Sequence, residues 1–263
     1  MTTVLFLKLL LVPALIVLVT LAGRRWGPAV AGWLSAFPVV AGPILFFIAV
    51  EQGALFAAQA AVGTLSAVLG MLAFGLSYAW AATRFAWPLS LPLAYIGYGV
   101  AVFLLDWWNA ALPAAVLGVL AGLWIGPRLY PVLTEAPRPA VKPPGDLLLR
   151  MGMGAMLVLL VTYFAASLGP ALSGILAMFP VMGTVLVLFT HRSAGAAASI
   201  QLLRGMVLGF YSFATFCAVL AWTLQMIGIG PAFLCAIAAA ALVQLLSRLW
   251  LGRHGLIIVP RAR

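Results

Sequence analysis

The feature that most constrains this chain is a succession of about nine apolar runs, each close to the roughly 20 residues that a helix needs to cross a bilayer. The runs fall at about 4–22, 28–50, 55–81, 86–105, 107–127, 147–166, 170–190, 196–223 and 229–249. Only 7% of the 263 residues are charged, whereas about a quarter of a soluble domain is charged. We therefore expect an all-α integral membrane protein whose solvent is the lipid bilayer. This composition excludes soluble enzymes, nucleic-acid-binding proteins and secreted disulfide scaffolds.

The charges indicate how the spans are oriented. If alternate loops lie on opposite faces, Lys8 falls on one face, Arg204 lies inside a span, and the remaining basic residues share the other face. These are Arg24, Arg25, Arg84, Arg128, Arg138, Lys142, Arg150, Arg192, Arg248, Arg253, Arg261 and Arg263. Because basic loops stay in the cytoplasm, we expect the amino terminus outside the cell membrane and the carboxy terminus in the cytoplasm.

The chain contains an internal sequence repeat. Shifting the sequence so that Gly27 aligns with Gly169 aligns the two copies, and this shift is the repeat offset. Residues 27–47 (GPAVAGWLSAFPVVAGPILFF) then align with 169–189 (GPALSGILAMFPVMGTVLVLF), and nine of 21 positions are identical. Chance would give about two or three in so biased a composition. The same offset pairs Gln59 with Gln201. Each repeat holds four spans, and the span at 107–127 joins them.

Five spans separate equivalent points of the two repeats, and because five is odd, the repeats have opposite orientations. Inverted repeats are common in transporters, which bind their substrates near the bilayer midplane between the halves. We predict a first four-helix repeat, a linker transmembrane helix, a proline-rich cytoplasmic loop, an inverted second four-helix repeat and a basic cytoplasmic tail. Their ranges are 1–105, 106–127, 128–146, 147–250 and 251–263.

Two equivalent prolines, Pro38 and Pro180, lie near the middle of their spans. A proline there removes a backbone hydrogen bond and clashes with the carbonyl four residues back, and in lipid the freed carbonyl needs a new partner. One interpretation is a pair of broken helices that line a substrate site. The other is a pair of kinked helices that pack closely through small residues. On the first interpretation, the binding residues at the breaks are Phe37, Pro38, Gly42, Phe179, Pro180 and Gly183.

Three polar side chains inside the spans complete the predicted substrate-binding set. Gln59 and Gln201 lie about a turn or more into their spans, where an amide seeks a hydrogen-bond partner. They either bind a solute or join one helix to another. Arg204 lies one turn beyond Gln201. Its guanidinium either reaches the lipid head groups or lines an electropositive vestibule for an anionic solute.

Nothing in the spans suggests catalysis. No Asp, Glu, Lys or His falls at a predicted midplane, which also weighs against coupling to protons or sodium, and no Walker, GxSxG or HExxH motif occurs. His191 and His254 lack ligand partners at metal-site spacing. Cys217 and Cys235 lie in apolar runs, and we expect buried thiols. The chain is therefore predicted not to be an enzyme and to hold no metal or cofactor.

Short motifs of the first repeat point to a family. They are Lys8, Arg24-Arg25, Ala31-Gly32, Phe37-Pro38 and the acidic turn Glu51-Gln52-Gly53. In these features the chain resembles the GlpM family of small four-helix proteobacterial inner-membrane proteins. The second repeat looks like another copy, with Arg150, Gly174 and Phe179-Pro180, but it lacks the acidic turn. The resemblance covers roughly 8–105 and 150–249. It implies two fused units in the bacterial inner membrane and an association with exopolysaccharide (alginate) production, without an assigned mechanism.

We therefore predict a transporter-like or flippase-like protein of the bacterial inner membrane, with a periplasmic amino terminus. It would move a small solute or a lipid-linked precursor through a midplane site between the inverted repeats. The alternative is a non-transporting scaffold of an envelope exopolysaccharide assembly machine, for which the loop at 128–146 would be the sensitive region. The sequence does not identify the solute, and it leaves open whether copies of the chain form a homo-oligomer.

Overall fold

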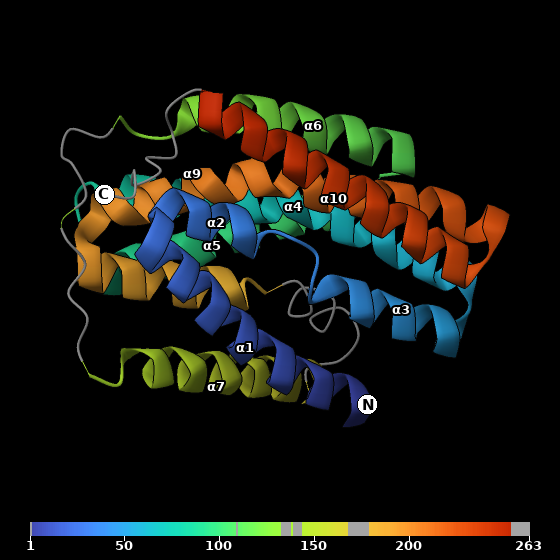
Figure 1. Ribbon diagram of the computed structural model, residues 1–263, viewed down its shortest axis with the longest axis horizontal. Helices are drawn as coiled ribbons and strands as arrows, with labels where there is room; N and C mark the ends of the chain where they lie inside the picture. The colour runs from blue at the N-terminus through green and yellow to red at the C-terminus, as the bar shows by residue number, and fades with distance from the viewer. Residues whose placement is uncertain (1, 109, 133–137, 139–143, 168–178, 254–263) are drawn as a thin grey trace.

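The computed structural model describes residues 2–108, 110–132, 138, 144–167 and 179–253. Within these ranges every regular element is a helix, which confirms the all-α prediction, and most of the helices run roughly along the long axis of the molecule (Figure 1). The helices are α1 (Thr2–Trp26), α2 (Pro28–Ser35), α3 (Ala41–Gln52), α4 (Ala54–Ala82), α5 (Trp87–Trp108), α6 (Leu112–Leu129), α7 (Asp146–Ser167), α9 (Val181–Ile227) and α10 (Ile229–Arg253).

Seven helices of the described chain are long and apolar enough to cross a bilayer, fewer than the roughly nine spans that the apolar runs predict. The difference arises in two places. The second predicted span is divided into α2 and α3, which have 8 and 12 residues and are individually too short to cross. The 47 residues of α9 bend back at Gly195, so that its two parts run in opposite directions (Figure 1). Residues 168–178, which begin the seventh predicted span, lie outside the described residues.

Two glycines turn the chain in the same way at positions that the repeat offset equates. Gly53, between α3 and α4, has φ 89° and ψ 164°, and Gly195, within α9, has φ 85° and ψ 176°. Residues with a side chain rarely adopt such a positive φ, so both turns depend on glycine. The agreement between the repeats therefore extends from sequence to backbone geometry.

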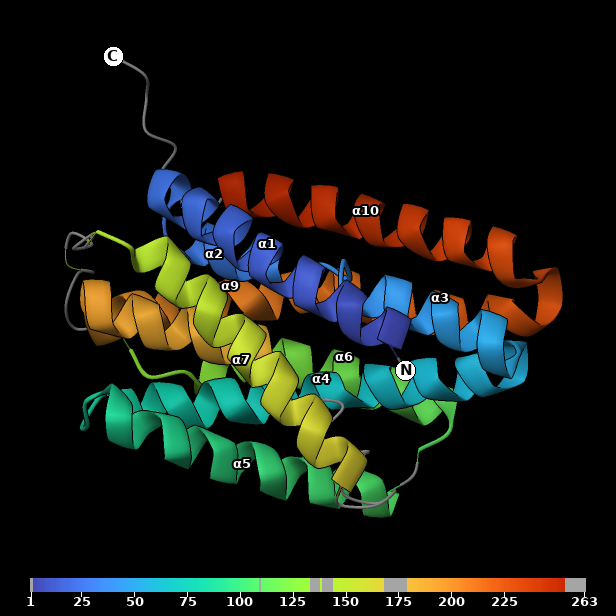
Figure 2. The ribbon, with the colours of Figure 1, turned by 90° about the horizontal axis from the view of Figure 1, so that it is seen from below.

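Elements that the repeat offset equates also pack against each other. The first helix, α1, lies against α7, and α4 lies against α9 (Figures 1 and 2). The helices α1 and α7 run in opposite directions. The helix α4 likewise runs opposite to the part of α9 that follows Gly195. The outer helices α5 and α10, which are also equivalent, run in opposite directions too.

The helix α2 packs on α9 through glycine, with backbone against backbone. A side chain at Gly205 would meet the carbonyl of Ala29, and one at Gly209 would meet the carbonyl of Trp33. On the α2 side, Gly32 faces the carbonyl of Leu202 in the same way. Small residues allow helices to approach this closely in membranes, where dispersion contacts replace the hydrophobic effect as the attraction between helices. The close-packing interpretation therefore holds for α2.

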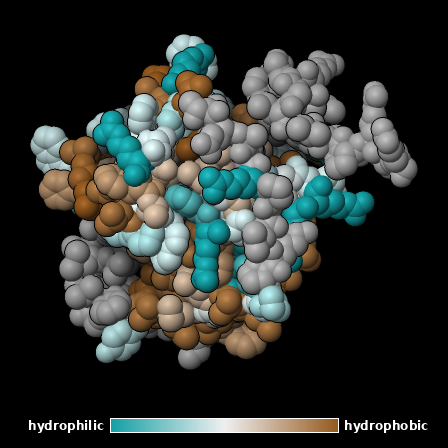
Figure 3. Space-filling model, turned by 90° about the vertical axis from the view of Figure 1, so that its left-hand side faces the viewer, coloured by the Kyte–Doolittle hydropathy of each residue, from teal (hydrophilic) through white to brown (hydrophobic). Residues whose placement is uncertain are grey.

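Basic residues gather at one end of the bundle. This end contains the last turns of α1 and α6, with Arg24, Arg25 and Arg128, and the turn after α4 (Figure 1, left). Hydrophilic side chains are conspicuous when the molecule is viewed from that end (Figure 3). The carboxyl ends of α3 and α5, which carry Glu51 and Asp106, lie at the opposite end. The charge asymmetry expected for the loops is thus present in the fold.

The connection between the repeats differs slightly from its predicted bounds. Because α5 continues to Trp108, the boundary expected at 105/106 falls in its last turn. Beyond α6, the backbone N–H of Arg138 donates to the carbonyl of Ala194 in α9 at 3.3 Å. Most of the predicted loop at 128–146 lies outside the described residues.

Candidate functional site

The second predicted span is interrupted at Pro38, as the sequence suggests. Residues 36–40 are not helical, and α3 resumes at Ala41. The carbonyls freed at the end of α2 are satisfied by side chains. Ser35 Oγ donates to the carbonyl of Gly32 at 2.7 Å, and Gln244 Nε2 on α10 donates to the carbonyl of Trp33 at 3.1 Å. These bonds meet the requirement that backbone polar groups in a bilayer find partners within the protein.

The break at Pro180 repeats the geometry of the break at Pro38. The N–H of Val39 donates to the carbonyl of Phe37 at 2.8 Å, and the N–H of Val181 donates to that of Phe179 at 2.8 Å. The prolines accept equivalent bonds as well. Gly42 N donates to Pro38 O at 2.9 Å, and Thr184 N donates to Pro180 O at 2.8 Å. Both bonds at the first break therefore recur at the equivalent positions of the second.

A cavity of about 230 Å³ lies between the two breaks. It is bounded by the α2–α3 break, α4, both parts of α9, and the facing sides of α1 and α7. Ten of its lining residues form five pairs that the repeat offset equates. The pairs are Phe37/Phe179, Val40/Met182, Thr64/Met206, Val68/Phe210 and Met71/Phe213. The cavity is thus built from the same positions of both repeats.

The cavity lining is apolar and carries no formal charge among the described residues. Its polar side chains are Ser35, Thr64 and Thr162. Ser35 donates its hydroxyl hydrogen to Gly32, and Thr64 Oγ1 donates to the carbonyl of Ala60 at 2.8 Å. These two hydroxyls consequently offer a ligand only acceptor lone pairs. Such a lining suits an uncharged group and does not compensate a bound ion.

The predicted residues at the breaks are brought together, but they do not all line the cavity. Phe37, Phe179 and Pro180 are lining residues. Pro38 and Gly42 are buried next to it, with Gly42 facing the ring of Phe216. Gly183 is also buried and faces Met206 and Phe74 instead of the cavity.

The predicted amides lie elsewhere. Gln59 is exposed on the outer side of α4, and Gln201 is half-buried, and neither belongs to the described cavity lining. Arg204 Nη2 donates to the carbonyl of Pro131 at 3.0 Å, so its guanidinium reaches the basic end of the bundle. Burial raises the pKa of the neighbouring Tyr130 phenol, against a smaller lowering by the Arg204 charge, so this phenol is neutral at physiological pH.

Two faces that line the cavity, on α4 and on the second part of α9, were not predicted from the sequence. Thr64, Val68 and Met71 occupy one face of α4 at helical spacing, and Met206, Phe210 and Phe213 occupy the equivalent face of α9. The repeat offset contained this information. The repeat offset pairs these two faces of the third and eighth predicted spans with each other. The polar residues Gln59 and Gln201, which were predicted to bind the substrate, lie on other faces.

The hydrogen bond from Gln244 to the α2 break gives a first prediction. Gln244→Leu should lower the free energy of unfolding by about 1–3 kcal/mol, because the buried carbonyl of Trp33 loses its partner. The measurement is unfolding of the purified protein in detergent. The matched control is Gln59→Leu, which changes an exposed amide and should alter stability by less than about 0.5 kcal/mol. Equal stability of the two variants would contradict a supporting role for Gln244.

Comparison with family models, with characterised proteins and with solved structures finds no match for this chain. The resemblance of its short motifs to the GlpM family therefore stays a prediction. What the site does has to be inferred from its own residues.

Proposed function

We propose that this chain is a transporter-like or flippase-like membrane protein in which two inverted repeats enclose a substrate cavity. The proposal rests mainly on one observation, which is that equivalent residues of both repeats line the same cavity. Its lining includes five pairs of repeat-equivalent residues, so it lies where an axis relating the repeats would pass. Transporters built from inverted repeats bind their substrates at that place, beside discontinuous helices.

The directions of the helices support the inversion of the repeats. Equivalent helices run oppositely in the pairs α1/α7 and α5/α10, and α4 runs opposite to the part of α9 after Gly195 (Figures 1 and 2). The matching backbone bonds at the two breaks support the duplication itself. A fold that only needed kinked helices for packing would not require both breaks to face one cavity.

The cavity chemistry favours an uncharged substrate portion. No charged side chain is among the described lining residues, and the available hydroxyls act as acceptors. The volume of about 230 Å³ lies below the roughly 300 Å³ at which pockets for larger ligands begin. We therefore propose a small neutral solute or a hydrocarbon segment of a lipid-linked precursor, and not a free anion, as the occupant of this cavity.

The proposal places the chain in the bacterial inner membrane. The basic end of the bundle, which contains the last turn of α1 and the first turn of α7, would face the cytoplasm. The start of α1 lies at the other end, so the amino terminus would be periplasmic.

Cysteine labelling tests the cavity without knowledge of the substrate. The background is Cys235→Ser, because Cys235 is exposed, contrary to the sequence expectation. Cys217 is buried and is therefore expected to stay unlabelled. In proteoliposomes, Thr64→Cys should react with a small water-soluble methanethiosulfonate, because its side chain lines the cavity. The matched control is Leu65→Cys at the next position. The Leu65 side chain is only 1% exposed and packs in the core, so a cysteine there should stay unlabelled. Protection of both cysteines would show a closed, dry bundle and would contradict the proposal.

Movement through the protein is tested in the same vesicles with two probes. Wild-type protein should accelerate either glycerol permeation, seen by light scattering, or exchange of a fluorescent phospholipid between leaflets, seen by dithionite quenching. Pro38→Ala and Pro180→Ala should each slow that movement by at least about tenfold, if the helix breaks shape the path. Unchanged rates in both variants would reject a transport role for the breaks.

A further inference from the structure

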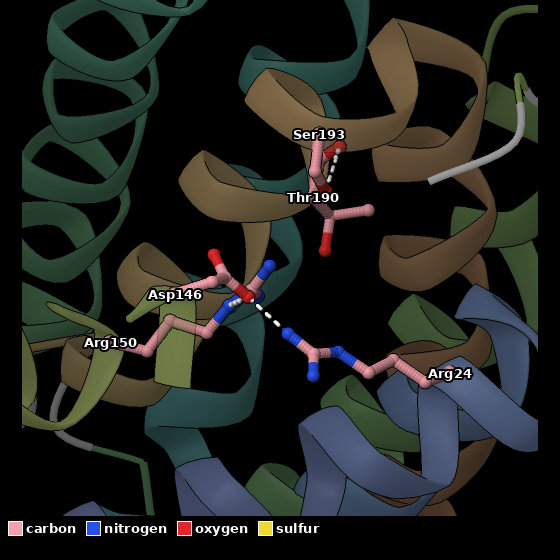
Figure 4. Close-up of polar contacts among 5 residues, drawn as sticks. All are labelled: Arg24, Asp146, Arg150, Thr190 and Ser193. Atoms are coloured by element: carbon pink, nitrogen blue, oxygen red, sulfur yellow. Dashed lines mark hydrogen bonds and ion pairs between the residues drawn. The ribbon is translucent and has the colours of Figure 1, made fainter. Parts of the chain in front are cut away.

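A second pocket of about 70 Å³ lies at the basic end, between α1, α7 and the first part of α9. Its charged residues form one cluster. Asp146 Oδ2 accepts a hydrogen bond from Arg24 Nη2 at 2.5 Å and another from Arg150 Nε at 2.9 Å (Figure 4). Asp146 and Arg150 are each only 5% exposed. Arg150 also lies over the ring of Phe189, with its guanidinium carbon 4.9 Å from the ring centroid.

The cluster carries an excess positive charge. Two guanidinium groups share one carboxylate, so the sum of the formal charges is +1. The one other acidic residue near this end in sequence, Glu135, lies outside the described residues. Asp146 and Arg150 are buried, whereas the Arg24 side chain is 23% exposed. Buried charges are favourable only when they are neutralised and their hydrogen-bonding capacity is used. One arginine would have sufficed for Asp146, and the second leaves donors for another anion.

Hydroxyl groups line the same pocket. Thr190 and Ser193 reach it from α9, and Figure 4 shows their side chains beside the Arg24–Asp146 pair. Thr20 reaches it from α1, is 6% exposed, and its Oγ1 has no hydrogen-bond partner among the described residues. Helical threonines usually bond to the carbonyl four residues back, as Thr215 does here. The unused hydroxyl of Thr20 therefore points to a ligand.

We infer that the pocket formed by Arg24, Arg150, Thr20 and Thr190 binds a phosphate-type oxyanion. Guanidinium forks and hydroxyl donors are the groups that recognise tetrahedral oxyanions, and an anion here would neutralise the cluster. The volume of about 70 Å³ is several times the roughly 10–15 Å³ that one water needs. This site lies about two turns of α1 and α7 from the apolar cavity, since Val12 and Val158 line the cavity and Thr20 and Arg150 line the pocket. It is independent of whether the protein transports anything.

The oxyanion can come from free phosphate or from a lipid head group, and the experiment separates the two. Delipidated protein in a maltoside detergent is titrated with inorganic phosphate by calorimetry. In a second arm, nanodiscs of phosphatidylcholine with or without phosphatidic acid are compared by native mass spectrometry. Binding in the first arm identifies free phosphate as sufficient. Binding only in the second identifies a phospholipid head group.

Variants decide whether binding occurs at this pocket. Arg24→Gln should weaken binding of the active probe by at least about tenfold, because a charge-assisted donor is lost. Arg25→Gln removes the same charge at the next, exposed position and should leave binding unchanged. Thr20→Val keeps the shape of the side chain and should weaken binding about three- to tenfold, which preserves the test if Arg24→Gln fails to fold. No binding of either probe, or equal effects of Arg24→Gln and Arg25→Gln, would overturn the inference.

Discussion

Gly205→Leu is expected to lower the free energy of unfolding by more than about 3 kcal/mol, and to abolish a monodisperse species in detergent. The side chain would enter the contact between α9 and α2, where the nearest atoms belong to the backbone of Ala29. A flexible side chain could move away from a new methyl group, but a helix backbone cannot without separating the two helices. Because Ser35, Ala36 and Phe37 at the end of α2 line the cavity, this separation should also disrupt the site.

The control for this prediction is Gly152→Leu. Gly152 is an exposed glycine of α7 with no atom near the position of a side chain. In a lipid-facing helix, leucine in place of glycine should be neutral or slightly stabilising, since glycine is the poorer helix former. The measurements are size-exclusion profile and thermal unfolding of both variants. If Gly205→Leu behaves like Gly152→Leu, the close approach of α2 and α9 is wrong.

Much of the architecture is readable from the sequence because the bilayer imposes it. Apolar length predicts the spans, and a proline in mid-span predicts the broken helix at Pro38. The offset between the repeats aligns Gly53 with Gly195, and both glycines turn the chain with positive φ. The apolar runs at 170–190 and 196–223 also separate where the chain turns, but they did not predict that α9 continues through this turn without an intervening loop. A single glycine, Gly195, makes that turn shortly after His191 and Arg192.

The rotation of each helix about its axis was much harder to predict. In a soluble protein, the apolar face of a helix identifies the buried side. In lipid both sides are apolar, so α4 gives no such signal, and Gln59 proved to face outward while Thr64 faces the cavity. Polarity alone therefore did not indicate which face of α4 lines the cavity. The repeat offset is the better guide to the cavity, because ten of its lining residues form five pairs that the offset equates.

The burial of Asp146 was equally hard to predict from the sequence. Counting charges near the ends of spans treats each as solvated. Arg24 and Arg150 therefore entered the predicted orientation and the family resemblance, but no predicted site. The spacing of Asp146 and Arg150, four residues apart at the start of a helix, was the one local signal of a pair. Contact with Arg24, which is distant in the sequence, depends on the packing of α1 against α7.

Removal of the Asp146 carboxylate should have the other large effect. Asp146→Asn leaves two guanidinium groups facing each other, and Arg150, at 5% exposed, has little access to water. Breaking a buried ion pair by removing one partner costs about 3–5 kcal/mol. We expect a loss of this size in the free energy of unfolding, measured in detergent. Asp106→Asn, at an exposed position of the opposite end, should change stability by less than about 0.5 kcal/mol.

A second substitution separates the charge from the packing. Combining Asp146→Asn with Arg150→Met removes the unpaired buried cation and should recover most of the lost stability, because apolar replacements of buried ion pairs are often neutral.

The inferred oxyanion site also predicts how the single variant Asp146→Asn responds to phosphate. With the carboxylate gone, the two arginines and Thr20 would hold an anion without competition, so phosphate should stabilise Asp146→Asn more than it stabilises the wild type. A single variant as stable as the wild type would show that Asp146 does not hold the arginines together. A destabilised single variant that gains no stability from the probe that the wild type binds, inorganic phosphate or phosphatidic acid, would support the role of Asp146 in holding the arginines and would count against the anion.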